Sequence, residues 1–551
     1  MIPLRVAQVA TVLAAQVHPG TEAPADLGRT VTDVTTDSRA VGPGSLFVAL
    51  EGERVDGHAF VAGAFAQGAV AVLVAHVVDG AGGPQLVVPD PLLALGRLAR
   101  HVVDRLRGPD GLRVVGITGS QGKTSTKDLL GAVLAAAGPT VAPAGNLNNE
   151  LGVPLTVLQV EGSGSASEGN PAGGVGGRPS SGQGSGSASE GNPAGGVGGR
   201  PSSGQGSGSA SEGNPAGGVG GRPPSGQGTS FLVAEMGARG IGHIAYLCGI
   251  APPDVAVVLN VGHAHVGEFG GREAIAQAKG ELVEAVGEDG IAVLNASDPR
   301  VWAMRSRTRA RVLPFGVEQA VDGPDGVWAE DLVGDDRGRY TFTLRVRSAG
   351  EERSAHVALR GTGRHQVANA TAAAAAAVAL GLDLELVAGA LSAAEPASRW
   401  RMEVHDRADG VRVVNDSYNA NPASMAAAVE TLAELGRGRG RTWAVVGDML
   451  ELGVEAPALH AELAAQLAAA EVDEVVALGE FAPLLVAGQP GRARIAQDTA
   501  QASAWVRADV APGDVVLVKA SRGLALDVVA DDILRAPDPE RDADAEAGGR
   551  A

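Results

Sequence analysis

Short apolar runs alternate with amphipathic segments along most of the chain. From Leu112 onward, runs rich in β-branched residues are separated by helical patterns, which predicts a parallel sheet with crossover helices. The strands expected in this middle region are 113–117, 231–234, 255–260 and 291–294. The same alternation returns further on, with strands expected at 411–414, 442–446, 474–478 and 515–518.

The first part of the chain predicts a small α/β unit. An amphipathic helix is expected from the spacing of the apolar residues Val6, Val9, Ala10 and Leu13. Apolar runs that predict strands follow at 46–50, 70–74 and 85–88. A shift in composition at 394–399 marks the boundary between the middle and last domains. The chain is therefore expected to be an α/β protein with domains at 1–110, 111–395 and 396–536 and an acidic tail at 537–551.

A threefold repeat interrupts the middle region. Residues 162–183, 184–205 and 206–227 repeat one 22-residue unit almost without change, and Pro224 alone breaks the pattern. The unit has one valine and no larger apolar side chain, so it cannot offset its ordering entropy by burial. We predict a disordered insertion within the domain, dispensable for activity.

Composition narrows the classes of protein. A net charge of −19 argues against a general nucleic-acid binder, whose affinity depends on neutralising phosphates. The single cysteine, Cys248, excludes a disulfide framework. The longest apolar run, 372–380, is too short to span a bilayer, and no signal-like segment begins the chain. We expect a soluble, cytoplasmic protein without membrane insertion, acting as a monomer.

The stretch 114–126 predicts a phosphate-binding loop. An apolar strand pattern leads into G-x-x-G-x-x-G-K-T, from Gly116 to Thr124, and a helical pattern follows. Unpaired N–H groups at such a helix start favour anions. Lys123 can neutralise phosphate oxygens, and the Thr124 hydroxyl can ligate Mg²⁺. The first glycine comes one residue earlier than in the strict Walker pattern. An ordinary turn before a helix is the alternative, but the combination favours phosphate binding.

Polar residues follow several other strand patterns. The run 146–154 contains amides that could hold oxyanions, although a turn before Pro154 explains much of it. Glu235 follows a strand and could hold Mg²⁺, with a salt bridge or a helix cap as an equal alternative. His265, two residues after His263, is a candidate metal ligand or supporting residue. Spacing alone makes Lys279 a solvated lysine.

Two polar clusters in the first unit have an ordinary explanation. Ser38 and Arg39 follow Asp37, and Gly57 and His58 follow Asp56. Asx-turns with a solvated arginine account for such clusters when each is considered alone.

These residues together resemble the Mur ligase family. The general signatures are the loop at 116–124, the run 146–154, Glu235, the set 260–265, Lys279 and the box from Gly363 through His365 to Asn369. More specific are D-S-Y-N-A-N-P-A-S-M at 416–425 and G-D-M-L-E-L-G at 447–453, which match the branch of the family that adds D-alanyl-D-alanine. The resemblance covers the chain except the repeat and the acidic tail.

The resemblance implies a three-domain architecture and a ligase reaction. A small N-terminal α/β domain binds a UDP-sugar, a central P-loop-like domain binds ATP with Mg²⁺, and a Rossmann-like C-terminal domain closes over both. ATP phosphorylates the terminal carboxylate of UDP-N-acetylmuramoyl-tripeptide, and the amine of D-Ala-D-Ala attacks the acyl phosphate.

The resemblance also implies roles for individual residues. Catalytic roles go to Lys123, Lys279, His265 and Arg401. ATP contacts are implied for Thr118, Gly119, Ser120, Gln121, Gly122, Lys123, Thr124, Ser125, Asn369 and Asp416. The metal set is Thr124, Glu235, His265 and Lys279, the last as a carbamylated lysine, which first requires a neutral amine. Substrate contacts are implied for Ser38, Arg39, Asp56, Gly57, His58, Asn148 and Asn149, which reverses the turn-only interpretation of the first five.

Two other functions compete with this one. A sister ligase would add a diamino acid, or glutamate to folate, and the segments 416–425 and 447–453 argue against it. A nucleotide-dependent regulatory protein would use the phosphate loop as a sensor, and it would not need the polar clusters near the C-terminus.

Overall fold

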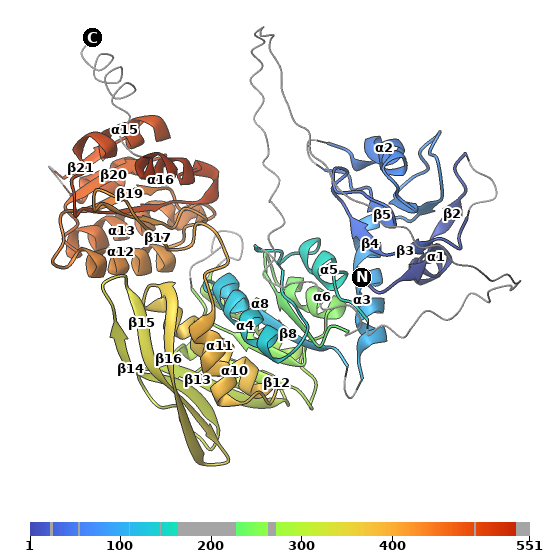
Figure 1. The fold of residues 1–551 in the computed structure, drawn as a ribbon, viewed down its shortest axis with the longest axis horizontal. Coiled ribbons are helices and arrows are strands. Elements are labelled where there is room, and N and C mark those ends of the chain that lie inside the picture. The colour runs from blue at the N-terminus through green and yellow to red at the C-terminus, as the bar shows by residue number, and fades with distance from the viewer. Residues whose placement is uncertain are drawn as a thin grey trace, which may run out of the picture.

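The computed structural model describes residues 1–21, 26–52, 55–108, 111–143, 145–162, 228–262, 271–489 and 492–535. These form sheets of five, nine and six strands and a two-stranded ladder, arranged in three units along the chain (Figure 1). The predictions of disorder for the repeat at 162–227 and of a frayed acidic tail at 537–551 fall on residues that, apart from Gly162, lie outside the described ones.

The first unit is built on a five-stranded sheet. In spatial order its strands are β2 (Gln16–His18), β7 (Gln85–Val87), β6 (Ala71–Val74), β5 (Ser45–Val48) and β4 (Asp33–Thr35). All neighbours are parallel except β2 and β7. A ladder of β1 (Leu4–Arg5) and β3 (Thr30–Val31) lies beside helix α1 (Val6–Leu13). The predicted helix is confirmed, and its four apolar residues are buried.

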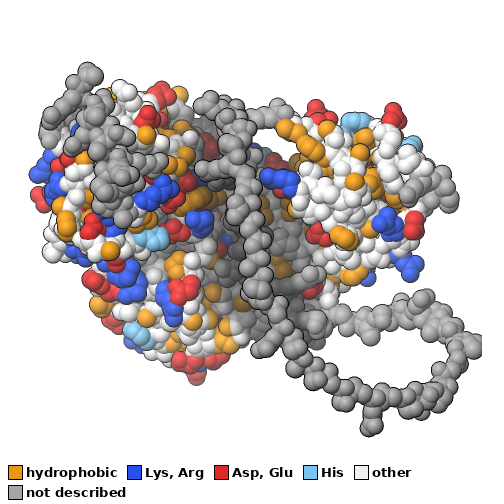
Figure 2. Space-filling model, turned by 45° about the horizontal axis from the view of Figure 1, so that its top comes forward, with side chains coloured by type: hydrophobic (Ala, Val, Ile, Leu, Met, Phe, Trp, Pro, Cys, Tyr) orange, Lys and Arg blue, Asp and Glu red, His pale blue; other side chains and the backbone are white. Residues whose placement is uncertain are grey.

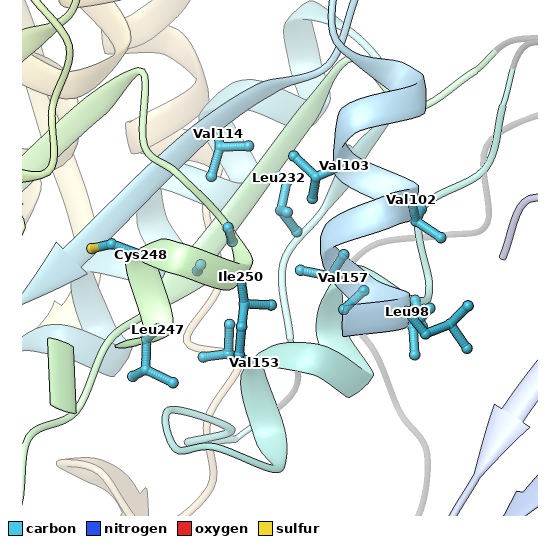
Figure 3. Packing of buried hydrophobic residues seen from close by; sticks show 14 of the residues in the cluster. Leu98, Val102, Val103, Val114, Val153, Val157, Leu232, Leu247, Cys248 and Ile250 are labelled. Carbon is cyan, nitrogen blue, oxygen red and sulfur yellow. The ribbon is translucent and has the colours of Figure 1, made fainter. Parts of the chain in front are cut away.

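Helix α3 (Pro91–Leu106) joins the first unit to the second. Asp90 caps it by accepting a hydrogen bond from the N–H of Leu93 at 2.9 Å. Its apolar side packs against α5 (Gly152–Val157) and α6 (His243–Ile250), as Figure 3 shows. A single hydrophobic core therefore runs from the first unit into the second.

The middle sheet is mainly parallel. In spatial order its parallel strands are β14 (Gly326–Gly334), β13 (Arg311–Val317), β12 (Ile291–Asn295), β11 (Val255–Val258), β8 (Arg113–Thr118), β10 (Phe231–Glu235) and β9 (Thr140–Val141). Helices α4 (Lys123–Ala137), α10 (His365–Ala379) and α11 (Leu384–Ala393) share a core with one face, and α6 and α8 (Arg272–Glu284) share a core with the other. The four predicted strands are confirmed as parallel neighbours.

Two antiparallel strands, which the sequence analysis did not predict, extend the parallel middle sheet. Strand β15 (Arg339–Ser348) is antiparallel to β14, and β16 (Glu351–Thr362) is antiparallel to β15. Buried and half-buried residues alternate along β15, with Tyr340 and Phe342 among the inward side chains. Such alternation is typical of an antiparallel strand with one solvated face.

The last unit has its own six-stranded sheet. The parallel strands, in spatial order, are β18 (Arg412–Asn415), β22 (Val515–Lys519), β19 (Thr442–Gly447), β20 (Glu474–Leu478) and β21 (Ala493–Ile495), and β17 (Glu403–Asp406) is antiparallel to β18. The helices are α12 (Pro422–Gly436), α13 (Ala456–Ala469), α14 (Ala482–Ala487), α15 (Thr499–Asp509) and α16 (Asp527–Leu534). The four predicted strands are again confirmed.

Each sheet falls within one of the predicted domain ranges, although the core shared through α3 crosses the limit near residue 110. The exact boundaries stay predictions. Acidic and basic side chains are interspersed on the visible face of the molecule (Figure 2). Within the described residues, helices that combine the length and apolar character needed to cross a bilayer are absent.

Candidate active site

A cavity of about 810 Å³ lies where the middle and last units meet, and the phosphate loop forms part of its wall. Most of the predicted site residues line it. They are Gly119, Ser120, Gln121, Gly122, Lys123, Thr124, Ser125, Asn148, Asn149, Glu235, Lys279, Asn369, Arg401 and Asp416. The carboxyl ends of β8, β10 and β11 deliver residues to it, as open α/β sheets commonly do for ligands.

The end of the neighbouring strand holds the phosphate loop in shape. The side-chain oxygen of Asn260, just after β11, accepts hydrogen bonds from the N–H groups of Ser120 and Gln121, both at 3.0 Å. Gly122 has a φ of 80°, and a Cβ atom there would lie 2.3 Å from the side-chain oxygen of Asn369. The positive φ and the contact with Asn369 both favour glycine at this position.

Thr118 and Lys123 occupy opposite sides of the loop. The Thr118 hydroxyl donates to the carbonyl of Met236 at 2.9 Å, beneath the loop and outside the cavity wall. Lys123 Nζ donates to the Gly119 carbonyl at 3.0 Å. Burial lowers the pKa of the Lys123 ammonium, which nearby Glu235 raises in part. Nucleotide contact by Thr118 stays a prediction.

Glu235 is held by two polar neighbours at the end of β10. Its Oε2 accepts from the Thr124 hydroxyl at 3.0 Å, and its Oε1 accepts from the Asn148 amide at 2.9 Å. The side chain is 1% exposed. A hydroxyl and a carboxylate beside a phosphate loop are the hard oxygen donors that Mg²⁺ prefers, so this pair fits the ion.

Of the two other predicted metal ligands, Lys279 and His265, the structure describes only Lys279. Lys279, on α8, lines the cavity and is 6% exposed. Burial lowers the pKa of its ammonium well below the usual range, and Lys123 lowers it further. His265 lies outside the described residues. Among the residues the structure describes, no three His, Cys, Asp or Glu side chains converge as a metal cluster.

Arg401 reaches the phosphate loop from the last unit. Its Nη2 donates to the Thr124 hydroxyl at 3.1 Å, and its guanidinium lies 4.2 Å from the centre of the Tyr418 ring. Its Nε is buried without a hydrogen-bond partner. Asp416 accepts from the Met402 N–H at 3.1 Å and pairs with Lys519 at 2.6 Å. Residues of the last unit thus complete the wall opposite the loop.

Asn369 and His365 lie one turn apart on α10, as their i, i+4 spacing predicts. Asn369 accepts from the Thr126 hydroxyl at 3.4 Å and donates to Gln366 at 3.0 Å. The Nδ1 atom of His365 is buried without a partner, and burial lowers the pKa of this imidazole although Asp416 raises it.

Three further residues of the cavity wall, His365, Tyr418 and Lys519, were given no individual role, although His365 belongs to the predicted box 363–369. All three lie in polar runs that follow strands or precede a helix. Position in such a run was the available signal, but it did not separate them from their neighbours.

The structure does not bring the predicted sugar-binding residues to this cavity. Asp37 pairs with Arg39 at 2.8 Å, beside Ser38, in the first unit. His58 donates from Nδ1 to Asp56 at 2.6 Å and accepts the Ala75 N–H on Nε2 at 3.0 Å, which gives its neutral tautomer. The contacts of Asp37 with Arg39 and of Asp56 with His58 are the local turn contacts expected from the clusters alone, whereas the bond from Ala75 to His58 joins segments 17 residues apart. Contact with a substrate stays a prediction for this set, Gly57 included.

The two predicted asparagines have different surroundings. Asn148 orients Glu235, as described above, and its carbonyl accepts the Gly237 N–H at 2.8 Å. Asn149 accepts from the Gly152 N–H at 2.7 Å and so caps α5. Both side chains line the cavity.

Family models match three parts of the chain. They are "Mur ligase family, catalytic domain" at 30–102, "Mur ligase middle domain" at 117–166 and 224–377, and "Mur ligase, glutamate ligase domain" at 400–522. The UDP-N-acetylmuramoyl-tripeptide–D-alanyl-D-alanine ligase of Mycobacterium tuberculosis is 39% identical, with 96% of this chain and 98% of that protein aligned. Its counterpart in Escherichia coli is 31% identical over 91% and 93% of the two chains.

Solved structures agree with these matches. MurF from Acinetobacter baumannii has a TM-score of 0.74 and 29% identity, covering 97% of this chain and 99% of that one. MurF ligase from Thermotoga maritima, solved in complex with ADP, has a TM-score of 0.68 and 27% identity over 91% and 97%. The family models, the full-length relatives and the shared three-unit architecture lead to one conclusion: this chain belongs to the Mur ligase family.

Proposed function

We propose that this chain is an ATP-dependent ligase that joins D-alanyl-D-alanine to UDP-N-acetylmuramoyl-tripeptide, in cytoplasmic synthesis of peptidoglycan precursors. One observation carries the proposal: the phosphate loop, the Thr124–Glu235 pair and Arg401 from the last unit meet in one cavity. The relatives with the same printed function align over nearly the whole chain.

The first step requires two anions to approach each other. A carboxylate oxygen of the tripeptide attacks the γ-phosphorus of ATP, and the bond to the ADP oxygen breaks. Lys123 and Arg401 both line the cavity, where their charges can stabilise the transferring phosphoryl group. The N-terminal end of α4, which begins at Lys123, favours the phosphates that remain on ADP.

The second step joins the amine to the activated carbonyl. The neutral amine of D-Ala-D-Ala attacks the acyl-phosphate carbon, the amide bond forms as the carbon–oxygen bond to phosphate breaks, and the departing phosphate takes up the proton that the amine loses. We place the amine on the side of the last unit, whose segment 416–425 forms part of the cavity wall. The first unit, with Ser38, Arg39, Asp56, Gly57 and His58, takes the UDP-sugar.

The side chains that can donate electron pairs to Mg²⁺ define the proposed metal site. Thr124 and Glu235 hold Mg²⁺, with Lys279 and His265 as further members, and the ion supplies charge neutralisation between the two reacting anions. A Lys279 amine with a lowered pKa is able to react with CO₂ and lose a proton, which converts it into a carbamate oxygen ligand.

Release of phosphate tests the proposal against its alternatives. Purified protein is incubated with ATP, Mg²⁺ and UDP-N-acetylmuramoyl-tripeptide, and then with D-Ala-D-Ala, with a diamino acid or with neither. We expect release only with D-Ala-D-Ala. Release that depends on the diamino acid would identify a sister ligase, and release without an acceptor would favour a nucleotide-dependent regulatory protein.

A further inference from the structure

Lys127 is a fully buried lysine that the proposed reaction does not use. It lies on α4, one turn after Lys123, and its side chain is 0% exposed. It lies outside the cavity wall. A charged amine is costly to bury unless its N–H groups all have acceptors.

The Lys127 ammonium is compensated by two hydrogen bonds and one ion pair. It donates to the carbonyl of Pro143 and to the carbonyl of Gly145 at 2.8 Å, and it pairs with Asp128 Oδ1 at 2.8 Å. The two carbonyls precede the loop that presents Asn148 to Glu235. Lys127 thus ties this loop to the phosphate-loop helix.

Asp128 extends the contact to the last unit. Its second oxygen, Oδ2, accepts a hydrogen bond from the Ser398 hydroxyl at 2.5 Å. Ser398 lies three residues before Arg401, in the segment that connects α11 to β17. Both Asp128 and Ser398 lie outside the cavity wall.

The backbone between Ser398 and Arg401 is constrained. Trp400 and Met402, on either side of Arg401, have φ values of 59° and 53°, a region that bulky residues rarely adopt. The Trp400 carbonyl accepts from the Tyr418 N–H at 3.1 Å, and the Met402 N–H donates to Asp416 at 3.1 Å. An anchor at Ser398 therefore sets where the Arg401 guanidinium lies.

We infer that Lys127, Asp128 and Ser398 form a partly buried positioning network that fixes Arg401 and the Asn148 loop against the phosphate loop. The network acts on the reaction through Arg401 and touches no substrate. This inference rests on the proposed function, because that function assigns Arg401 to the transferring phosphoryl group.

Substitutions at Ser398 test the network with little disturbance of the core. Ser398→Ala removes the hydroxyl, and Ser398→Thr keeps it. We expect Ser398→Ala to lower kcat about 10-fold with KM for ATP changed less than about twofold, and Ser398→Thr to restore most of kcat. Ser306→Ala is the matched control, because the exposed Ser306 hydroxyl donates only to its own helix turn, at Ala303, 3.1 Å away.

A double substitution separates positioning from a general structural role. In an Arg401→Ala background, Ser398→Ala should cause no further loss of kcat, because its effect passes through Arg401. An equal fractional loss in both backgrounds would overturn the inference, as would unchanged kcat in Ser398→Ala alone.

Hydrogen exchange keeps the test independent of the proposed function. In the full-length protein without substrates, Ser398→Ala should speed amide exchange in 398–402 relative to wild type and to Ser306→Ala. Unchanged exchange there contradicts the network even if the wild-type protein is an active ligase. Faster exchange in a protein that fails the phosphate-release assay would support the network and reject the proposed function.

Discussion

Glu161 and Thr229 exchange two hydrogen bonds across the threefold repeat. The Glu161 N–H donates to the Thr229 hydroxyl at 2.9 Å, and the Thr229 N–H donates to the Glu161 carbonyl at 2.8 Å. The two residues are 68 positions apart. The folded core therefore holds the two ends of the repeat together.

Deletion of 162–227 with a four-residue glycine-serine bridge should leave ligase activity within about twofold of wild type. Shortening the closed loop from 66 residues to four lowers the entropic cost of closure, so the unfolding free energy should rise by about 2 kcal/mol. Denaturant titration and the phosphate-release assay measure both quantities. A folded deletion variant without activity would reject the view that the repeat is dispensable.

Lys123→Ala should abolish turnover while leaving the UDP-substrate bound. The lysine faces the phosphates, and the predicted sugar-binding residues lie in another unit, so the two effects should separate. We expect kcat to fall at least about 100-fold. Calorimetric titration with UDP-N-acetylmuramoyl-tripeptide provides the control, and loss of that binding would indicate a folding role for Lys123 instead.

Glu235→Gln should raise the Mg²⁺ concentration required for half-maximal activity by about 10-fold or more. The substitution keeps the shape of the side chain and an oxygen that can accept from Thr124 or Asn148, but it removes the negative charge. Activity measured across a Mg²⁺ series checks the expectation. An unchanged Mg²⁺ dependence would indicate that Glu235 is only a structural hydrogen-bond acceptor.

The destabilising effect of the buried Lys279 charge on the unfolding free energy should decrease as pH rises. Its pKa is lowered in the folded state, so the unfolded chain binds more protons between that pKa and about 10.4, the ordinary value. Stability therefore increases with pH through this window, and the cost of the buried charge is greatest below it. Lys279→Met removes this contribution.

The direction of this pH dependence can be checked from the unfolding free energies of wild type and Lys279→Met. Both proteins are measured in metal-free and CO₂-free buffer. We expect the variant to be the more stable protein near neutral pH and the difference to shrink toward pH 10. Parallel curves for the two proteins would show that Lys279 keeps its ordinary pKa.

The parts of the site that could be predicted are mainly those formed by residues close together in the sequence. The strand, the glycine-rich loop and the helix that begins at Lys123 are neighbours in sequence, so the phosphate loop could be recognised before any packing was known. Glu235 could be placed at the same edge because it ends a parallel strand beside β8.

Contacts between distant segments could not be predicted in the same way. The bond from Arg401 to Thr124 depends on how the last unit approaches the middle one, and no spacing in the sequence encodes that approach. The buried position of Lys127 is equally non-local, because its acceptors come from a loop and from a neighbouring aspartate. The antiparallel strands β15 and β16 were missed although their alternating pattern is present in the sequence.

The core that passes through α3 bears on how such a chain can evolve. Exchange of gene segments near residue 110 would cut through packed side chains of α3, α5 and α6 and expose them to water. The apolar clusters of the last unit contain only residues from 402 onward, so exchange near 396–402 leaves both halves with intact cores. Recombination at 396–402 would therefore preserve the packing of each core, whereas recombination near residue 110 would separate residues that pack together.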